Sequence, residues 1–156
     1  MDLLLVKKKG LLVDFVALQL LSLSRREDPD DYLIFETAAA SGDEDDFEGY
    51  VQFKSGGASG YLFGESESRQ YRDSRGAVTD DQFEANSEAL GWRTDSRIPN
   101  HFGVFELPTL HCFALLGELV VDTLVLMHGL TPKGALRSNL HHFSGPSLSA
   151  TVRLLH

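Results

Sequence analysis

The stretch YVQFKSGGASGYLF, residues 50–63, decides the fold that we expect for this chain. Its two apolar parts, Tyr50–Phe53 and Gly60–Phe63, have strand length and are rich in aromatic and branched residues. The segment Ser55–Gly60 contains glycines, which tolerate the positive φ angles that tight turns need. The stretch therefore predicts an antiparallel β-hairpin.

Further strands are expected on both sides of this hairpin. Tyr32–Phe35 precedes it and His101–Leu107 follows it, and both segments have the composition of strands. Leu136–Phe143 and Leu148–Leu154 can each form an edge strand, and Ser144–Pro146 between them is typical of a turn.

A short helix, Asp80–Leu90, is marked at both ends. Thr79 can accept a hydrogen bond from the first turn, and Gln82, three residues later, completes a capping box. Gly91 is typical of the position just after a helix.

Two longer helices are expected to enclose the core. Gly10–Arg26 is amphipathic, and we expect it to pack on the sheet. Thr109–His128 is apolar over most of its surface, so we expect it to be largely buried, with Glu118 and Asp122 on its wet side.

These elements predict an α+β fold in which a small antiparallel sheet is flanked by helices. The expected order is helix, three strands, helix, strand, helix, and then one or two edge strands. A chain of 156 residues has the usual size of one domain, so we expect residues 1–156 to form a single domain. Its core should span about residues 10–143, whereas residues 1–9 and 144–156 fit the pattern less well.

Composition limits the partners. With 14 Lys and Arg against 23 Asp and Glu, the formal charge is -9, which disfavours nucleic-acid binding. The only cysteine, Cys112, cannot form an intrachain disulfide, and this fits a reducing compartment. Asp14 and Gln19 interrupt the first apolar run, and no small-x-small cleavage site follows it. We therefore expect a cytoplasmic protein that binds neither nucleic acid nor membranes.

Charge is unevenly distributed along the chain. Glu27–Glu48 holds ten acidic residues and no basic one, whereas Lys133–His156 holds basic residues and histidines without an acid. The two segments could attract each other, although a solvated loop and a basic tail explain the pattern without any special function. Ser41–Glu48 lacks the Asp spacing and the closing Glu of an EF-hand, so we expect a solvated loop there and not a calcium site.

Motifs for catalysis or metal binding are not found in the sequence. No two of the histidines and Cys112 have the His-x-x-x-His or Cys-x-x-Cys spacing of a metal site, and Cys112 lies in an apolar helix where a buried thiol is expected. Ser59 lacks a nucleophile elbow, and Gly129–Gly134 lacks the end of a phosphate-binding loop. We therefore expect no catalytic residues, no metal and no cofactor.

Aromatic residues are the remaining candidates for a functional surface. Side chains alternate along a strand, so Val51 and Phe53 should point one way and Tyr50 and Gln52 the other. We predict a partner-binding surface to which two strands, the short helix and the residue after it each contribute; its residues are Tyr50, Gln52, Tyr61, Phe83 and Trp92.

The order of these elements resembles the bacterial type III secretion chaperone-like family, which includes the YbjN-like and TY-Chap domains. The resemblance extends over roughly Gly10 to Leu140. It rests on the Tyr50–Phe53 strand, a glycine-containing turn, a strand ending at Glu65-Ser66, Thr79-x-x-Gln82, Leu90-Gly91-Trp92, Asn100-His101-Phe102 and the long apolar helix.

This resemblance implies a non-enzymatic domain that binds a client protein or peptide on a sheet flanked by helices, and that is often a homodimer. We accordingly expect a chaperone or adaptor. The alternative is a small immunity- or inhibitor-like protein whose acidic Glu27–Glu48 region docks on a basic partner.

Overall fold

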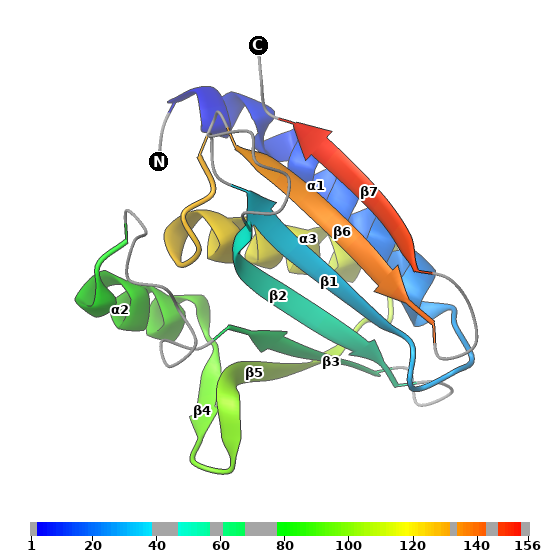
Figure 1. Ribbon diagram of the computed structural model, residues 1–156. Helices are drawn as coiled ribbons and strands as arrows, with labels where there is room; N and C mark the ends of the chain where they lie inside the picture. Colours follow the sequence, from blue (N-terminus) through cyan, green and yellow to red (C-terminus); the bar gives the residue numbers. More distant parts are fainter. Residues whose placement is uncertain are drawn as a thin grey trace.

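The computed structural model describes residues 3–38, 47–56, 61–67, 78–131, 134–142 and 147–153 (Figure 1). The helices and strands follow one another as α1 (Leu3–Ser24), β1 (Tyr32–Ala38), β2 (Phe47–Ser55), β3 (Tyr61–Ser66), α2 (Asp80–Leu90), β4 (Arg93–Asp95), β5 (Ile98–Glu106), α3 (Leu110–Leu126), β6 (Ala135–His141) and β7 (Leu148–Arg153). The expected α+β class, an antiparallel sheet flanked by helices, is confirmed.

The seven strands in the described residues form one antiparallel sheet in the order β4-β5-β3-β2-β1-β6-β7. The predicted hairpin is the pair β2–β3, in which Phe53 lies opposite Gly64. β1 lies between β2 and β6, so Leu33 has Phe53 on one side and Leu140 on the other. Because these three side chains share one face, a continuous apolar surface crosses the centre of the sheet.

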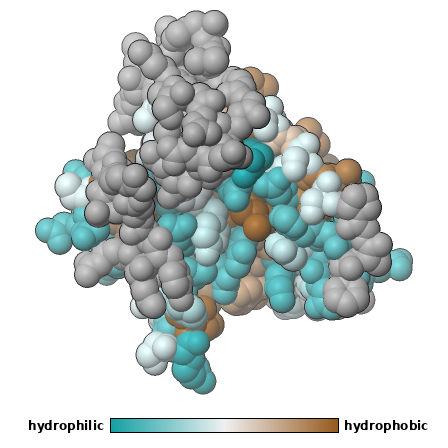
Figure 2. Space-filling view, viewed as in Figure 1, coloured by the Kyte–Doolittle hydropathy of each residue, from teal (hydrophilic) through white to brown (hydrophobic). Residues whose placement is uncertain are grey.

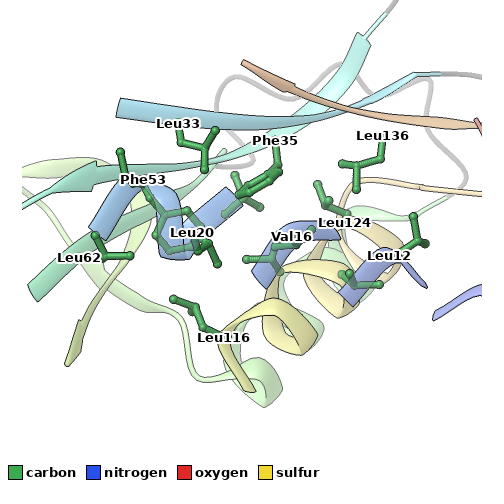
Figure 3. Packing of buried hydrophobic residues seen from close by; sticks show 14 of the residues in the cluster. Leu12, Val16, Leu20, Leu33, Phe35, Phe53, Leu62, Leu116, Leu124 and Leu136 are labelled. Atoms are coloured by element: carbon green, nitrogen blue, oxygen red, sulfur yellow. The ribbon is translucent and has the colours of Figure 1, made fainter. Parts of the chain in front are cut away.

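Helices α1 and α3 cover that face (Figure 1). Figure 3 shows side chains of the sheet pointing toward both helices; the labelled residues are Leu33, Phe35, Phe53, Leu62 and Leu136 of the sheet, Leu12, Val16 and Leu20 of α1, and Leu116 and Leu124 of α3. Phe35 and Phe53 are fully buried, and each such side chain contributes about 2 kcal/mol to folding. The expectation that the first helix packs on the sheet is therefore correct.

Close packing of the two long helices depends on a glycine. A Cβ added at Gly117 of α3 would lie 2.9 Å from the carbonyl oxygen of Val13 in α1. The absence of a side chain at Gly117 thus lets the two backbones approach each other.

Helix α2 lies beside one end of the sheet, next to the end of α3 (Figure 1). Its capping box is formed as predicted. The backbone N–H of Gln82 donates to the Thr79 hydroxyl, and the side-chain oxygen Oε1 of Gln82 accepts from the backbone N–H of Thr79. Gly91 follows with φ 88°, a left-handed conformation that glycine adopts without strain. Asn86 donates from Nδ2 to the carbonyl of Leu126 at 2.9 Å, which ties α2 to α3.

The structure differs from the expected elements in three places. β6 was expected to be an edge strand, but it lies between β1 and β7. α1 begins at Leu3 and not at Gly10, so the lysines before Gly10 belong to the helix. A short strand, β4, pairs with β5 and adds a hairpin between α2 and α3 that was not expected.

Three expected loops fall wholly or partly outside the described residues. These are the turn within Ser55–Gly60, the turn at Ser144–Pro146 and the acidic stretch Ser41–Glu48, of which only Phe47 and Glu48 are described, as the start of β2.

Candidate functional site

The sheet has a second face, opposite α1 and α3, which we call the open face. Within the described part of the chain, no helix lies on it (Figure 1). Strict alternation along the strands places its side chains there; they include Tyr32, Ile34, Glu36, Tyr50, Gln52, Lys54, Tyr61, Phe63, Glu65, Asn100, Phe102, Val104, Glu106, Arg137, Asn139 and His141. Figure 2 looks onto this side of the molecule, and the part of it that is coloured by hydropathy is largely hydrophilic with small hydrophobic areas between.

A polar network lies on the open face over β1, β6 and β7, toward one edge of the sheet. Arg137 of β6 donates from Nε and Nη2 to Oε2 of Glu36 in β1, at 2.9 and 2.6 Å. Asn139 donates from Nδ2 to the same oxygen at 3.0 Å and accepts a hydrogen bond from Ser149. Side chains of three neighbouring strands are therefore held in fixed positions, and they are already partnered before any ligand arrives.

Aromatic rings lie on both sides of this network. Tyr32 stacks on His141 with ring centroids 4.6 Å apart, and Phe63 stacks on Phe102 at 6.2 Å. On the open face the rings add flat apolar surface to a region that also offers hydrogen-bonding groups. Such a combination is typical of surfaces that contact other proteins.

Three of the predicted partner-binding residues lie on the open face. The Tyr50 hydroxyl accepts from Asn100 Nδ2 at 3.2 Å, and Gln52 donates from Nε2 to Glu65 Oε2 at 2.6 Å. Tyr61 is 45% exposed, whereas Phe53 is fully buried on the other face. The predicted alternation in β2 is therefore correct.

The other two predicted residues, Phe83 and Trp92, are wrong as surface candidates. Phe83 is fully buried, since the fourth residue of α2 turns inward and its ring lies 5.7 Å from the rings of both His101 and His128. Trp92 is 7% exposed, because its Nε1 donates to the Thr123 hydroxyl of α3. Both belong to the core and cannot touch a partner in this conformation.

A buried polar cluster lies where α2, α3 and the sheet meet. His128 Nε2 is 2.8 Å from the Ser66 hydroxyl, and the Thr37 hydroxyl donates to the His128 carbonyl at 3.2 Å. Ser66 is fully buried and His128 is 4% exposed. Because no part of the hydroxyl reaches the surface, this serine–histidine pair holds elements together and does not present a nucleophile to a substrate.

The two oppositely charged segments of the sequence do attract each other. Besides the Glu36–Arg137 pair, Asp31 Oδ2 lies 3.4 Å from His142 Nδ1 and 3.5 Å from Arg26 Nη1. Asp31 is buried, so its carboxylate is used within the fold.

The described residues contain neither a metal-binding cluster nor a membrane-spanning helix. Within them, no group of three or more His, Cys, Asp or Glu side chains is arranged to hold a metal ion. No helix in the same part of the chain is long and apolar enough to cross a membrane.

The sequence did not identify Glu36, Arg137 and Asn139 as a unit. Arg137 and Asn139 are alternate polar residues of the expected strand Leu136–Phe143, and Glu36 lies one residue beyond the expected strand Tyr32–Phe35. Glu36 and Arg137 are 101 residues apart, so only the pairing of β1 with β6 brings them together.

Comparison with known proteins gives no match, since no protein family, no curated protein and no solved structure is significantly similar to this chain.

Proposed function

We propose that this domain binds a segment of another protein on the open face of its sheet and acts as a non-enzymatic chaperone or adaptor. The observation that carries the proposal is the difference between the two faces. α1 and α3 bury one face, whereas the other presents partnered polar groups beside aromatic rings, with Tyr61 45% exposed at its margin.

The fixed polar network favours binding over catalysis. Arg137, Glu36 and Asn139 are held by hydrogen bonds within the sheet, so little side-chain entropy is lost when a partner arrives. The stacked pairs Tyr32–His141 and Phe63–Phe102 supply flat area for a partner's side chains. A client protein or peptide is thus the expected partner, and a homodimer through this face is a related form of the same proposal.

The resemblance to the type III secretion chaperone-like family supports the same class of function. It adds the expectation of a cytoplasmic domain without nucleic acid, membrane or cofactor. These points remain proposals about this chain.

The acidic-docking alternative has weaker support. Two of the ten acidic residues between Glu27 and Glu48 are paired inside the fold, since Asp31 contacts Arg26 and His142, and Glu36 contacts Arg137. Fewer carboxylates are then left for a basic partner.

Quantitative affinity purification of the full chain tests the proposal. Tyr61→Ala removes exposed aromatic area from the open face, and Leu18→Ala removes a 64% exposed side chain from α1 as the matched control. We expect specific proteins to be depleted with Tyr61→Ala and retained with Leu18→Ala. The purification is repeated in high salt, which screens charge–charge contacts at the surface. Bound proteins that are retained in high salt support binding at the open face, whereas proteins lost in high salt support acidic docking. Equal recovery with both variants would contradict the proposal.

A further inference from the structure

An apolar groove of about 360 Å³ lies away from the centre of the open face, between β5 and α3. One wall is the end of β5 and the residues after it, and the other is the first half of α3. Its lining is Val104, Phe105, Glu106, Leu107, Cys112, Leu115, Leu116 and Leu119. Val104 and Leu115 are 55% and 53% exposed, so the groove is open to solvent.

The strand wall of this groove has an unpaired backbone edge. β5 pairs with β3 from His101 to Glu106, but on its other side β4 reaches only from Ile98 to Phe102. No other strand in the described residues lies against Gly103–Glu106 on that side. Alternate residues of this four-residue stretch therefore direct their backbone N–H and C=O groups to a free sheet edge next to an apolar groove.

A free strand edge beside a helix fits an extended segment. Main-chain hydrogen bonds to the edge add a strand to the sheet, and alternate side chains of the added strand then point into the groove. Apolar side chains match the lining, which contains no basic residue and one carboxylate, Glu106. Glu106 is exposed and forms no ion pair with a described residue, so a Lys or Arg of the segment would complement it.

The size of the edge favours a short peptide over a second copy of this chain. Four residues span only about 13 Å, and the strand addition they permit is far smaller than the roughly 1,200 Å² or more that a stable dimer buries. A peptide segment needs no such area, because much of its affinity comes from the backbone pairing.

We propose that the groove between β5 and α3 binds an extended peptide segment of another protein by strand addition at Gly103–Glu106. The segment carries apolar residues at alternate positions and a Lys or Arg placed to meet Glu106. This site borders the open face at Val104 and Glu106 but is separate from the polar network over β1, β6 and β7, and the proposal holds whether or not that network binds a partner.

Selection of linear random peptides displayed on phage, with the full chain as the target, tests the proposal. The enriched peptide is then synthesised with a fluorescent label, and its affinity is measured by anisotropy. Leu115→Glu places a charge in the groove, and Leu18→Glu places the same charge on a leucine of α1 that is also more than half exposed. Leu115→Gln serves as a second groove variant if the glutamate impairs folding.

We expect enriched peptides with alternating apolar residues and a basic residue, and a loss of affinity of about tenfold or more with Leu115→Glu but not with Leu18→Glu. Methylation of one of the two sets of alternate backbone nitrogens, the set that faces β5, should abolish binding because it removes the donors of the added strand, whereas methylation of the other set should not. Cys112, the only cysteine, lines the groove, so the bound peptide should also slow its alkylation.

Several results would overturn the proposal. These are a selection without enrichment, equal affinity for the two glutamate variants, and undiminished binding of both methylated peptides. A selected peptide that loses affinity with Tyr32→Ala, in β1 of the open face, and not with Leu115→Glu would also overturn it, while supporting the function proposed for the open face.

Discussion

The imidazole Nε2 of His128 lies 2.8 Å from the hydroxyl oxygen of Ser66, and both side chains are buried. Ser66 ends β3 and His128 follows α3, so this hydrogen bond joins the sheet to the helical layer. Gly49 makes room for it, because a Cβ at that position would lie 2.6 Å from His128 Nδ1.

Ser66→Ala should lower the free energy of unfolding by about 1 to 2 kcal/mol, since it removes a hydrogen bond from a buried imidazole. Urea unfolding followed by circular dichroism measures the change. Ser96→Ala is the control, because Ser96 is exposed and its loss should change stability by less than about 0.5 kcal/mol. Equal stability of the two variants would show that the buried hydrogen bond contributes nothing.

Gly117→Ala and Gly10→Ala should have opposite effects. At Gly117 the added methyl group would lie 2.9 Å from the Val13 carbonyl oxygen, so α1 and α3 must move apart, at a cost of about 1 to 3 kcal/mol. At Gly10, within α1, nothing lies within 4 Å of the added atom, and alanine should stabilise the helix by about 1 kcal/mol. Thermal unfolding of both variants checks the prediction, and a shift of the same sign in both would refute the close packing of the two helices.

Thr79→Ala should destabilise the protein by about 1 kcal/mol, because the backbone N–H of Gln82 loses its acceptor at the start of α2. The readout is the midpoint of chemical denaturation. Thr94→Ala, at an exposed position of β4, is the matched control and should leave the midpoint nearly unchanged. A Thr79→Ala midpoint equal to that of the control would mean that the capping box does not stabilise α2.

Lys9 links the two long helices electrostatically. Its Nζ lies 2.9 Å from Asp122 Oδ1 and 3.2 Å from Glu118 Oε1. The hydrogen bond to Asp122 raises the pKa of Lys9 above its usual 10.5, against the opposing effect of burial. A raised folded-state pKa means that the stabilisation is fully present below pH 10.5 and is lost as the pH rises through the folded-state value.

Lys9→Met should therefore cost about 0.3 to 1 kcal/mol at neutral pH and low salt, and almost nothing once the wild-type lysine has lost its proton. Urea titrations at neutral pH and at a pH well above 10.5 measure both values. Lys54→Met is the control, since Lys54 is exposed and forms no ion pair with a described residue. A penalty for Lys9→Met that persists at the higher pH would show that packing, and not charge, explains it.

The sequence predicted the elements whose signals are local. The capping box at Thr79 and the glycine at 91 placed α2 at its observed bounds, and the weak segments near the C-terminus are the strands β6 and β7. The alternation of side chains along a strand also predicted correctly that Tyr50 and Gln52 lie on one face of the sheet and Phe53 on the other.

Features that depend on distant residues could not be predicted in this way. β4 has three polar residues and no apolar alternation, so only its pairing with β5 makes it a strand. The burial of Trp92 depends on Thr123, 31 residues away, which accepts the indole hydrogen bond. The polar network of the open face likewise requires β1 to lie beside β6.

Site-specific photo-crosslinking tests the central claim, binding at the open face, most directly. A photoreactive phenylalanine replaces Tyr61 in one protein and Leu18 of α1 in another, and both positions are exposed. In the cells that make the protein, we expect a discrete cross-linked adduct from position 61 and none from position 18, with the attached protein identified by mass spectrometry. Adducts from position 18 alone, or equal adducts from both positions, would contradict binding at the open face.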